Sequence, residues 1–418
     1  MRHLYTILLY IAIPFILLRL LWKSRKNPAY RQRIKERFGY LNKPLSTGGI
    51  WVHAVSVGEV LAAVPLIKQL QQRHPNLPII ITTMTPTGAD RVKAAFGETI
   101  PHVYVPYDLP SCNQRFLQNV KPRLIMMVET ELWPNLLNQA AQQKIPTVVL
   151  NARLSARSAN GYRRLGKLTR DMLKQVTLIA AQNKGDGERF VALGLPPEHL
   201  RVTGSIKYDL ELPANLMVKA QALQSQWAKR PVWIAASTHE SEEEIVLAAY
   251  HKILQKLPQI LLILVPRHPE RFNKVASLCQ KHRYSIVKRS EDLPITVQTQ
   301  IFLGDSMGEL LLFYACANVA FVGGSLVATG GHNPLEPAAL GLPVLTGPHM
   351  FNFAVIQKQL LDAGAAITIQ DATQLAETVI QLLQDKTKCQ TMGAKGEQIL
   401  RQNRGALARQ LELIETFL

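Results

Sequence analysis

Few features of this 418-residue sequence would support a metal centre, a disulfide framework or nucleic-acid recognition. The four cysteines are far apart and form no C-x-x-C or C-x-x-H pair, which argues against a zinc site and suits a reducing compartment. No D-x-D pair or H-E-x-x-H motif occurs, so the sequence indicates no bound metal. Aromatic residues make up only 7%, and no RNA- or DNA-binding signature is present, so we expect no nucleic-acid partner.

Two further absences exclude some classes of fold and function. No G-x-G-x-x-G fingerprint follows the first predicted strand, which argues against a nucleotide-linked dehydrogenase. No periodic repeat or low-complexity tract occurs, and hydrophobic residues make up 47% of the chain, so it is expected to be globular throughout. A chain of this length can form two domains, each with its own core.

Basic residues outnumber acidic ones, and the formal net charge is +18. Such a charge favours a phosphorylated or acidic substrate, or an anionic membrane surface. The N-terminus supports a membrane, because Leu4–Trp22 form an apolar run of 19 residues interrupted by Pro14 and Arg19. This length is close to the ~20 residues that a bilayer span requires.

The residues that flank this run predict its orientation. One basic residue, Arg2, precedes it, and seven follow it: Lys23, Arg25, Lys26, Arg31, Arg33, Lys35 and Arg37. The positive-inside rule therefore places the rest of the chain in the cytoplasm, held by a single N-terminal anchor. A cleaved signal peptide would instead carry its basic residues ahead of the run. Because Arg19 shortens the apolar core, a spanning helix and a helix lying in the membrane plane both remain open.

The rest of the sequence alternates short apolar runs with amphipathic stretches, a pattern typical of an α/β fold with parallel sheets covered on both faces. The alternation pauses in a polar stretch after Thr203 and then restarts. We therefore predict two doubly wound, Rossmann-like domains facing a cleft, with an N-terminal membrane-anchor helix. The predicted boundaries are 1–26 for the anchor, 27–204 for the first domain, 205–230 for a linker, and 231–418 for the second domain with its C-terminal helices.

The stretch from Val322 to Pro348 organises the second half, as a buried strand, a glycine-rich turn, a short helix and a second strand. Asn333 can cap the helix and Pro334 suits its first turn, which leaves backbone N–H groups for an anion. Glu336 would lie where its carboxylate can accept hydrogen bonds from a ribose diol. A tight turn with a capped helix explains the glycines alone, but the dense order of Gly330–Pro337 predicts a nucleotide-sugar pocket.

Carboxylates follow two predicted strands of the first half. Glu59 falls in the first turn of a helix, where it is either an ordinary helix-start glutamate or a general base at a strand end. Glu129 and Glu131 follow another strand and would project to the same side of an extended backbone. Each neighbouring carboxylate raises the pKa of the other, which favours a base.

Other candidates are basic or lie at helix starts. Lys207 follows a strand and would neutralise a departing phosphate, although a lone lysine is more often a surface residue. Arg267 and His268 follow an apolar strand and suit a phosphate, with an ion pair to Glu270 as the structural alternative. Met307–Glu309 open a helix after a strand. A basic stripe with helical spacing, Arg163, Lys167, Arg170 and Lys174, is either a solvated face or a site for lipid phosphates.

Taken together, these segments resemble the 3-deoxy-D-manno-octulosonic acid (Kdo) transferases of lipopolysaccharide assembly, a family of GT-B type. The resemblance rests on motifs that occur in the family's order and span nearly the whole chain. They are HAVSVGE, ETELWPN, NARLSARS, GSIKYD, PRHPERF, GDSMGEL and GGSLV with GGHNPLEPA.

The resemblance implies transfer of Kdo from CMP-Kdo to a lipid A precursor (lipid IVA) at the inner membrane, with inversion and without a metal or cofactor. It implies that Glu59 is the general base and that Glu129 and Lys207 stabilise the transition state. The implied CMP contacts are Arg267, His268, Met307, Gly308, Glu309, Asn333, Pro334, Leu335 and Glu336. A different GT-B enzyme using a UDP-sugar, and a membrane-tethered nucleotide-binding scaffold without turnover, are the alternatives.

Overall fold

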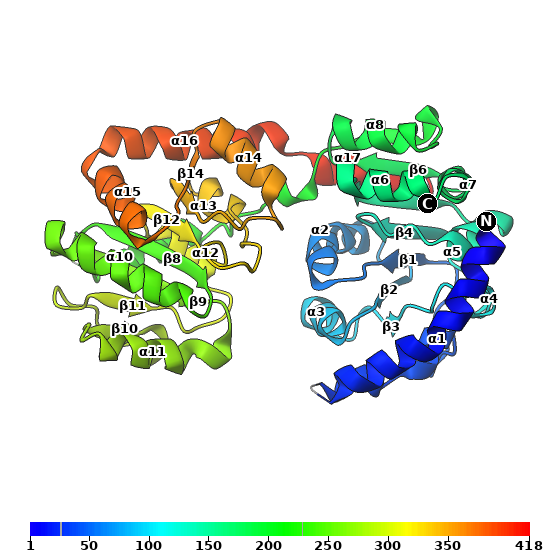
Figure 1. Cartoon of the computed structure of the whole chain (residues 1–418), viewed down its shortest axis with the longest axis horizontal. Coiled ribbons are helices and arrows are strands. Elements are labelled where there is room, and N and C mark those ends of the chain that lie inside the picture. The colour runs from blue at the N-terminus through cyan, green and yellow to red at the C-terminus, as the bar shows by residue number, and fades with distance from the viewer. Residues whose placement is uncertain (26, 228) are drawn as a thin grey trace. The chain divides into compact units, whose positions relative to one another are not determined.

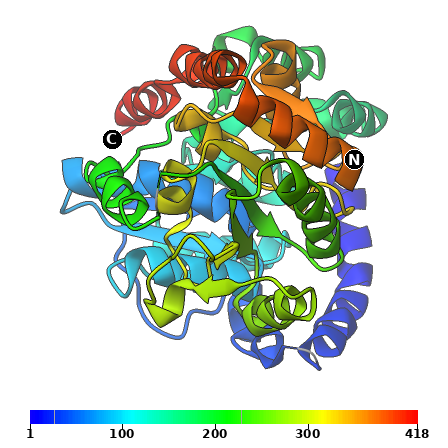
Figure 2. The same cartoon turned by 90° about the vertical axis from the view of Figure 1, so that its left-hand side faces the viewer.

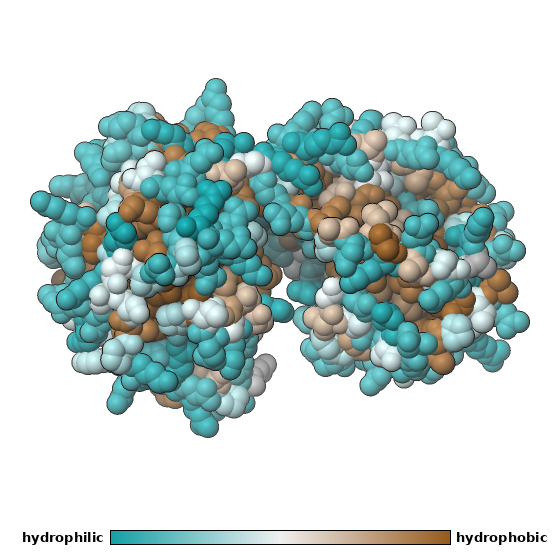
Figure 3. Space-filling model, turned by 180° about the vertical axis from the view of Figure 1, so that it is seen from behind, coloured by the Kyte–Doolittle hydropathy of each residue, from teal (hydrophilic) through white to brown (hydrophobic). Residues whose placement is uncertain are grey.

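The computed structural model describes residues 1–25, 27–227 and 229–418. The chain forms two compact units, Met1–Asp209 with Arg404–Leu418 and Leu210–Asn403. Each unit is a seven-stranded, all-parallel sheet covered by helices, so the predicted α/β fold class is confirmed. On the face shown in Figure 3, hydrophilic residues dominate the surface of each unit, and hydrophobic residues lie between them in small groups.

The sheet of the first unit has the order β3-β2-β1-β4-β5-β6-β7. Nearly all of its strand residues are buried, as expected for a parallel sheet with both faces covered. The strands are β1 (Ile50–His53), β2 (Ile79–Thr83), β3 (His102–Tyr104), β4 (Leu124–Val128), β5 (Thr147–Ala152), β6 (Leu178–Ala181) and β7 (Leu200–Val202).

Two hydrophobic cores lie on the two faces of this sheet. One face packs against α2 (Val57–Arg73), α3 (Pro86–Phe96) and α17 (Ala406–Glu415). The other packs against α4 (Pro110–Val120), α5 (Pro134–Gln142), α6 (Ala156–Arg164), α7 (Lys167–Leu173) and α8 (Lys184–Ala192). The N-terminal helix α1 (Arg2–Ser24) runs along the outside of the same unit, next to α4 (Figures 1 and 2).

The sheet of the second unit has the order β10-β11-β9-β8-β12-β13-β14. Its strands are β8 (Val232–Thr238), β9 (Leu261–Pro266), β10 (Ile286–Lys288), β11 (Ile301–Leu303), β12 (Val319–Val322), β13 (Val344–Thr346) and β14 (Ala366–Thr368). Its helices are α9 (Leu216–Gln224), α10 (Glu242–Lys256), α11 (Phe272–Lys281), α12 (Leu310–Ala315), α13 (Leu335–Ala339), α14 (Ala354–Asp362), α15 (Ala372–Gln384) and α16 (Lys386–Asn403).

In each sheet the first strand lies in the interior, and both of its neighbours come later in the chain. β1 pairs with β2 on one side and β4 on the other, and β8 pairs with β9 and β12. The chain therefore reverses its direction of progress across the sheet at these strands. Ligands of doubly wound sheets bind beyond the carboxyl ends of the strands at such a switch point.

The observed units differ from the predicted domain boundaries at two places. The last helix, α17, belongs to the first unit, because Leu407, Leu411 and Ile414 are buried in its core. The carboxylate of Asp209 also accepts hydrogen bonds from the backbone N–H groups of Gly405 (2.5 Å) and Leu407 (2.6 Å). The predicted linker 205–230 is divided between the units at Asp209, and α9 packs into the core of the second unit.

Candidate active site

Glu59 lies one turn beyond the end of β1, in a reciprocal cap at the start of α2. The backbone N–H of Glu59 donates to the hydroxyl of Ser56, and that hydroxyl donates to Glu59 Oε1 at 2.7 Å. The other carboxylate oxygen, Oε2, accepts from the N–H of Val55 at 2.7 Å. The sequence S-x-x-E is that of a capping box, but here the glutamate accepts from the N–H of Val55 rather than from that of the N-cap Ser56. These contacts hold the carboxylate at the carboxyl edge of the sheet.

Burial sets the acidity of this carboxyl group. Glu59 is 7% exposed, and burial raises its pKa from 4.5 to about 7, although the hydrogen bonds from Ser56 and Val55 lower it. The negative charges of Glu131 and Glu129 contribute to this rise. A carboxyl group with this pKa can accept a proton near neutral pH and is a stronger base than an exposed glutamate.

Glu129 and Lys207 meet at the same edge, although they are far apart in the sequence. Glu129 directly follows β4 and has a φ of 61°, in the left-handed region that is strained for a residue with a side chain. Its Oε1 lies 3.3 Å from Nζ of Lys207, and both side chains are 28% exposed. Glu131 accepts a hydrogen bond from the indole N–H of Trp133 at 2.9 Å. We call Glu59, Glu129, Glu131 and Lys207 the carboxylate cluster.

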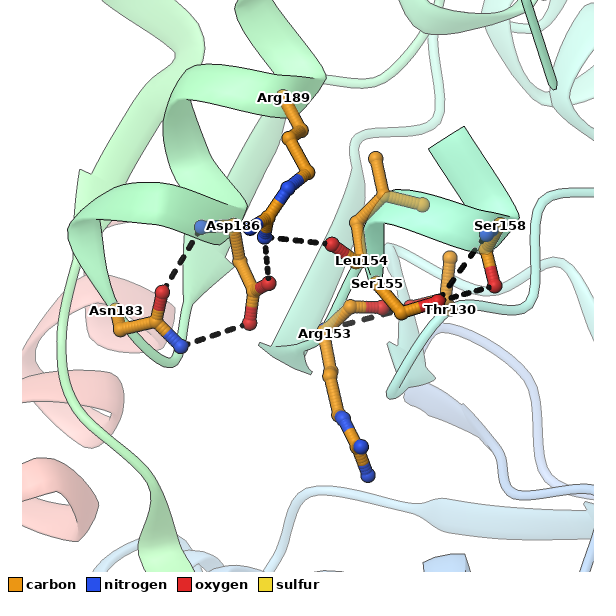
Figure 4. Close-up of polar contacts among 8 residues, drawn as sticks. All are labelled: Thr130, Arg153, Leu154, Ser155, Ser158, Asn183, Asp186 and Arg189. Atoms are coloured by element: carbon orange, nitrogen blue, oxygen red, sulfur yellow. Dashed lines mark hydrogen bonds and ion pairs between the residues drawn. The ribbon is translucent and has the colours of Figure 1, made fainter. Parts of the chain in front are cut away.

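Arg153, just beyond β5, presents a further cation that we did not predict from the sequence. Its backbone is fixed, because its N–H donates to Thr130 Oγ1 at 3.3 Å and its carbonyl accepts from the same hydroxyl. The next carbonyl, of Leu154, accepts from Arg189, which also pairs with Asp186 (Figure 4). The Arg153 guanidinium points away from these contacts, and no hydrogen bond or ion pair within the described residues holds it.

The predicted basic stripe does not lie on one helix. The segment is two helices, α6 and α7, which are separated at Gly166 with a φ of 51°. The glycine permits a positive φ that breaks the helical hydrogen-bond ladder, so the helical spacing of the four basic residues does not place them on one face. All four are nevertheless exposed.

In the second unit, three imidazoles and an arginine gather beyond β8, β9 and β12. His239 Nε2 lies 2.8 Å from His332 Nε2, with the two rings stacked, and His268 meets His239 edge to face at 5.3 Å. Burial and the nearby positive charge of Arg267 lower the pKa of His332 to about 3. Burial and the positive charges of His268 and Arg271 also lower the pKa of His239. This histidine cluster (His239, His268, His332 and Arg267) suits an anionic ligand, which would oppose these shifts.

A buried carboxylate supports the glycine turn after β12. Glu242 is 0% exposed and accepts hydrogen bonds from the N–H groups of Gly324 (2.6 Å), Ser325 (3.0 Å) and Leu326 (2.9 Å), and also of His239 (3.1 Å). A Cβ at Gly323 would lie 2.7 Å from the carbonyl oxygen of Ser237, so only glycine fits there. The turn and the strand end of β8 are thereby locked together.

Asn333 and Glu336 lie in the same region. Asn333 Oδ1 accepts from the N–H of Leu335 at 3.1 Å, and its amide donates to Glu336 Oε1 at 3.2 Å. The helix α13 starts at Leu335 with Pro334 at its N-cap, one residue later than predicted. Burial raises the pKa of Glu336, whereas the positive charge of Arg267 lowers it.

Met307–Glu309 belong to a separate contact group in this unit. Glu309 is the N-cap of α12, and its carboxylate pairs with the guanidinium of Arg289 at 3.0 Å. Gly308 has a φ of 85°, and Met307 is 59% exposed. The carboxylate of Glu309 is therefore already neutralised by Arg289. A ligand could still contact the backbone N–H groups of Met307–Glu309 and the exposed side chain of Met307.

The structure thus brings Glu59, Glu129 and Lys207 together in the first unit, and Arg267, His268, Asn333 and Glu336 together in the second. Sequence reasoning missed His239, Glu242 and Arg153. His239 and Glu242 follow an apolar strand in the same way as the residues that were selected, so position alone could have found them. Within the described residues, no three His, Cys, Asp or Glu side chains gather as metal ligands would.

Comparison with known families gives two matches that together cover most of the chain. Residues 32–210 match the model described as "3-Deoxy-D-manno-octulosonic-acid transferase (kdotransferase)". Residues 233–399 match the model "Glycosyl transferases group 1".

Full-length relatives agree with these matches. The chain is 47% identical to the 3-deoxy-D-manno-octulosonic acid transferase of Haemophilus influenzae, over 100% of this chain and 99% of that protein. It is 36% identical to the enzyme of the same name from Bordetella pertussis, over 88% of this chain and 87% of that protein.

Among solved structures, the chain resembles UDP-GlcNAc 2-epimerase from Neisseria meningitidis, with a TM-score of 0.54, 15% identity, and coverage of 85% of this chain and 99% of that chain. It also resembles Anabaena Alr3699/HepE in complex with UDP, with a TM-score of 0.55, 16% identity, and coverage of 88% and 99%. At these identities the likeness shows the fold, a two-unit GT-B-like architecture.

Proposed function

The chain belongs to the Kdo transferase family and is a glycosyltransferase, and on that premise we propose that it moves Kdo from CMP-Kdo to a lipid A precursor (lipid IVA) with inversion and without a metal ion. The observation that carries the mechanism is Glu59, a buried carboxyl group whose pKa is about 7 at the carboxyl edge of the first sheet. Its position and acidity match the needs of a general base.

In the proposed step, Glu59 takes the proton of an acceptor hydroxyl as the oxygen bonds to the anomeric carbon of Kdo. The bond between that carbon and the phosphate oxygen breaks, and CMP leaves with the electron pair. Direct displacement by the acceptor inverts the configuration at the anomeric carbon. The capping contacts of Ser56 and Val55 hold the carboxylate in place throughout, so little reorganisation accompanies proton transfer.

Lys207 and Glu129 are proposed to stabilise the transition state. The ammonium group of Lys207 would oppose the negative charge that develops on the departing phosphate. Glu129, 3.3 Å away, holds this side chain in position and balances its charge before the reaction. Arg153, whose guanidinium points away from the contacts of its backbone, is a further cation on the same sheet edge for an anionic group.

The second unit is proposed to bind CMP-Kdo. Arg267 and His268 would contact the phosphate, supported by the other imidazoles of the histidine cluster. Glu336 would accept hydrogen bonds from the ribose hydroxyls, with Asn333, Pro334 and Leu335 forming the turn before it. Met307, Gly308 and Glu309 would contribute backbone and side-chain contacts to the nucleotide. Binding of an anion here would oppose the lowered pKa values of His239 and His332 and favour their protonated forms.

The proposed location is the cytoplasmic side of the inner membrane. The chain has one helix, Arg2–Ser24, that is long and apolar enough to cross a bilayer by length and composition, among the residues described. A lipid A precursor is an amphiphile held in a membrane leaflet, so an enzyme attached to that leaflet meets its acceptor there. The excess of basic residues after the helix supports the cytoplasmic orientation.

The reaction is tested by product mass after incubation of the purified full chain with CMP-Kdo and tetra-acylated lipid A precursor. Products heavier by whole Kdo units support the proposal. Unchanged acceptor, from a chain that still binds CMP, would contradict the proposed acceptor or sugar.

Replacement of Lys207 by Met should lower the turnover rate by about 10²–10³-fold, because one preorganised cation that opposes leaving-group charge is lost. CMP binding to the second unit should be unaffected. The matched control is Lys93→Met, since Lys93 pairs only on the surface with Glu98 and is 77% exposed. Initial rates of both variants would show this, and a Lys207 variant as fast as the control would contradict the role.

A further inference from the structure

The N-terminal helix α1 is apolar all round, but only one of its faces is covered by the first unit. The half-buried residues recur with helical spacing and include Tyr5, Leu9, Ile13, Ile16 and Leu20. The residues of the opposite face are exposed by half or more: Leu4, Ile7, Leu8, Ile11, Phe15, Leu18 and Trp22. A contiguous exposed apolar face of this kind needs an apolar partner.

Contacts along its whole length dock α1 on the unit. Near its start, Arg2 donates to Asn138 and Thr6 donates to Asn135 Oδ1 at 3.0 Å. Its middle packs against Tyr107, Leu109 and Cys112. At its end the ammonium group of Lys23 lies over the ring of Tyr30 at 5.4 Å. The helix therefore lies against α5 near its start and, in its middle, against the beginning of α4 and the residues just before it (Figure 1).

A buried carboxylate anchors this docking. Asp108 is 5% exposed and is hydrogen-bonded to the hydroxyl of Tyr5. It also accepts from the N–H groups of Asn135 (3.0 Å) and Leu136 (2.7 Å) and from the amide of Asn113 (2.7 Å). Removing α1 would take one donor from this carboxylate and expose the apolar side chains beneath the helix, which carries a free-energy cost.

A docked α1 is incompatible with a bilayer span. A helix of 23 residues is about 34 Å long, so upright in a membrane it would take its docking partners to the same depth. Polar groups that contact it, such as Ser111 and Asn138, and the backbone at the ends of α4 and α5 would enter hydrocarbon. Each unsatisfied polar group there costs several kcal/mol.

The charges around α1 fit an anionic lipid surface. The first acidic residue of the sequence is Glu36, and it is neutralised by Arg33 at 2.7 Å. Arg25 and Arg31 are exposed just after the helix, and Arg19 is exposed on its apolar face, from which a long side chain can extend to the headgroup level. A helix with an apolar face toward the acyl chains and cations at the headgroup level is typical of interfacial attachment.

We propose that α1 lies in the plane of the cytoplasmic leaflet, with its Leu4–Trp22 apolar face among the lipids and its other face docked on the first unit, rather than spanning the bilayer. The first unit takes the place of the polar face that an ordinary interfacial helix would carry. This inference rests on the membrane location proposed above, and it adds the depth and orientation of the helix.

The test uses single cysteines in the full chain with Cys389 replaced by serine, since the other three native cysteines are buried. His3→Cys reports the start of α1, and Gln142→Cys, at the exposed end of α5, is the cytoplasmic control. A membrane-impermeant maleimide is applied to cells with a permeabilised outer membrane. We expect neither position to react before lysis and both to react after it. Labelling of residue 3 alone in intact cells would overturn the inference.

A second measurement tests the docking in the membrane fraction. Tyr10 Oη lies 3.4 Å from Ser111 Oγ, so the pair Tyr10→Cys and Ser111→Cys should join through a short thiol crosslinker. The control pair, Phe15→Cys with Ser111→Cys, starts from a residue on the exposed face and should join far less. Failure of the first pair would overturn the docked helix. Recovery of the chain in the soluble fraction would overturn the proposed location as well, and neither result depends on Kdo transfer.

Discussion

The Glu59→Gln variant should transfer Kdo about 10²–10⁴-fold more slowly than the native chain, because an amide cannot take the proton of the acceptor hydroxyl. Gln is isosteric with Glu, so its amide oxygen can still accept from the N–H of Val55 while its NH2 group donates to the hydroxyl of Ser56. The thermal unfolding midpoint should therefore change little. Single-turnover rates and calorimetry on the same preparation would separate the two effects.

Glu98→Gln is the matched control, because the Glu98 side chain is 92% exposed and pairs only loosely with Lys93 at 3.8 Å. It removes the same negative charge from the same unit without touching the carboxylate cluster. A nucleotide-binding scaffold without turnover would be indifferent to both changes. Equal rates for the two variants would therefore exclude Glu59 as the base.

The pH dependence of the native rate should report the same group. Burial holds the pKa of Glu59 at about 7, above its ordinary 4.5, so the basic form is the minor one at pH 6 and the major one at pH 8. The rate should rise about tenfold per pH unit below 7 and level off above it. The contribution of Glu59 to the free energy of unfolding changes with pH in the opposite direction to the rate. It is fully present below pH 4.5 and is lost as the pH rises through 7. A flat rate profile between pH 5.5 and 8 is the contrary result.

The Glu242→Ala variant should lose about 3–5 kcal/mol of unfolding free energy in the second unit, since it leaves several buried N–H groups without an acceptor. The turn after β12 and the strand end of β8 would also lose the group that joins them. CMP binding should then weaken, because His239 and the Gly324–Leu326 backbone would no longer be held in place.

The neighbouring Glu244 supplies the control for this prediction, since it is exposed on the same first turn of α10. Glu244→Ala should change stability by no more than about 0.5 kcal/mol. Denaturant unfolding of both variants, followed with and without CMP, would measure the two quantities. If the two variants were equally stable, the buried carboxylate would not support the turn.

Several site residues could be predicted from the sequence because they follow apolar strands. The capping box around Glu59 is written in four consecutive residues, and the run into Glu129 ends a buried strand. Parallel strands end at one edge of their sheet, so residues after several strands share that edge. The pairing of Glu129 with Lys207 could not be predicted, since it depends on which strands are neighbours.

The contrast between local sequence and tertiary packing also explains where the structure differs from the predictions. The four residues of the basic stripe have helical spacing in the sequence, which predicts a single helix. In the structure a positive φ at Gly166 divides this segment into two helices. The final helix followed the second sheet in sequence, yet its apolar face is buried in the first unit.

The two α/β sheets, the apolar N-terminal helix and the motifs of the Kdo transferase family can be predicted from the sequence, because they depend on local periodicity and on contiguous residues. The contact of His239 with His332, the support of the glycine turn by Glu242 and the covered face of α1 are visible only in the folded chain. Those contacts join residues far apart in the chain, and strand order and packing select them from many pairings that the local pattern allows equally.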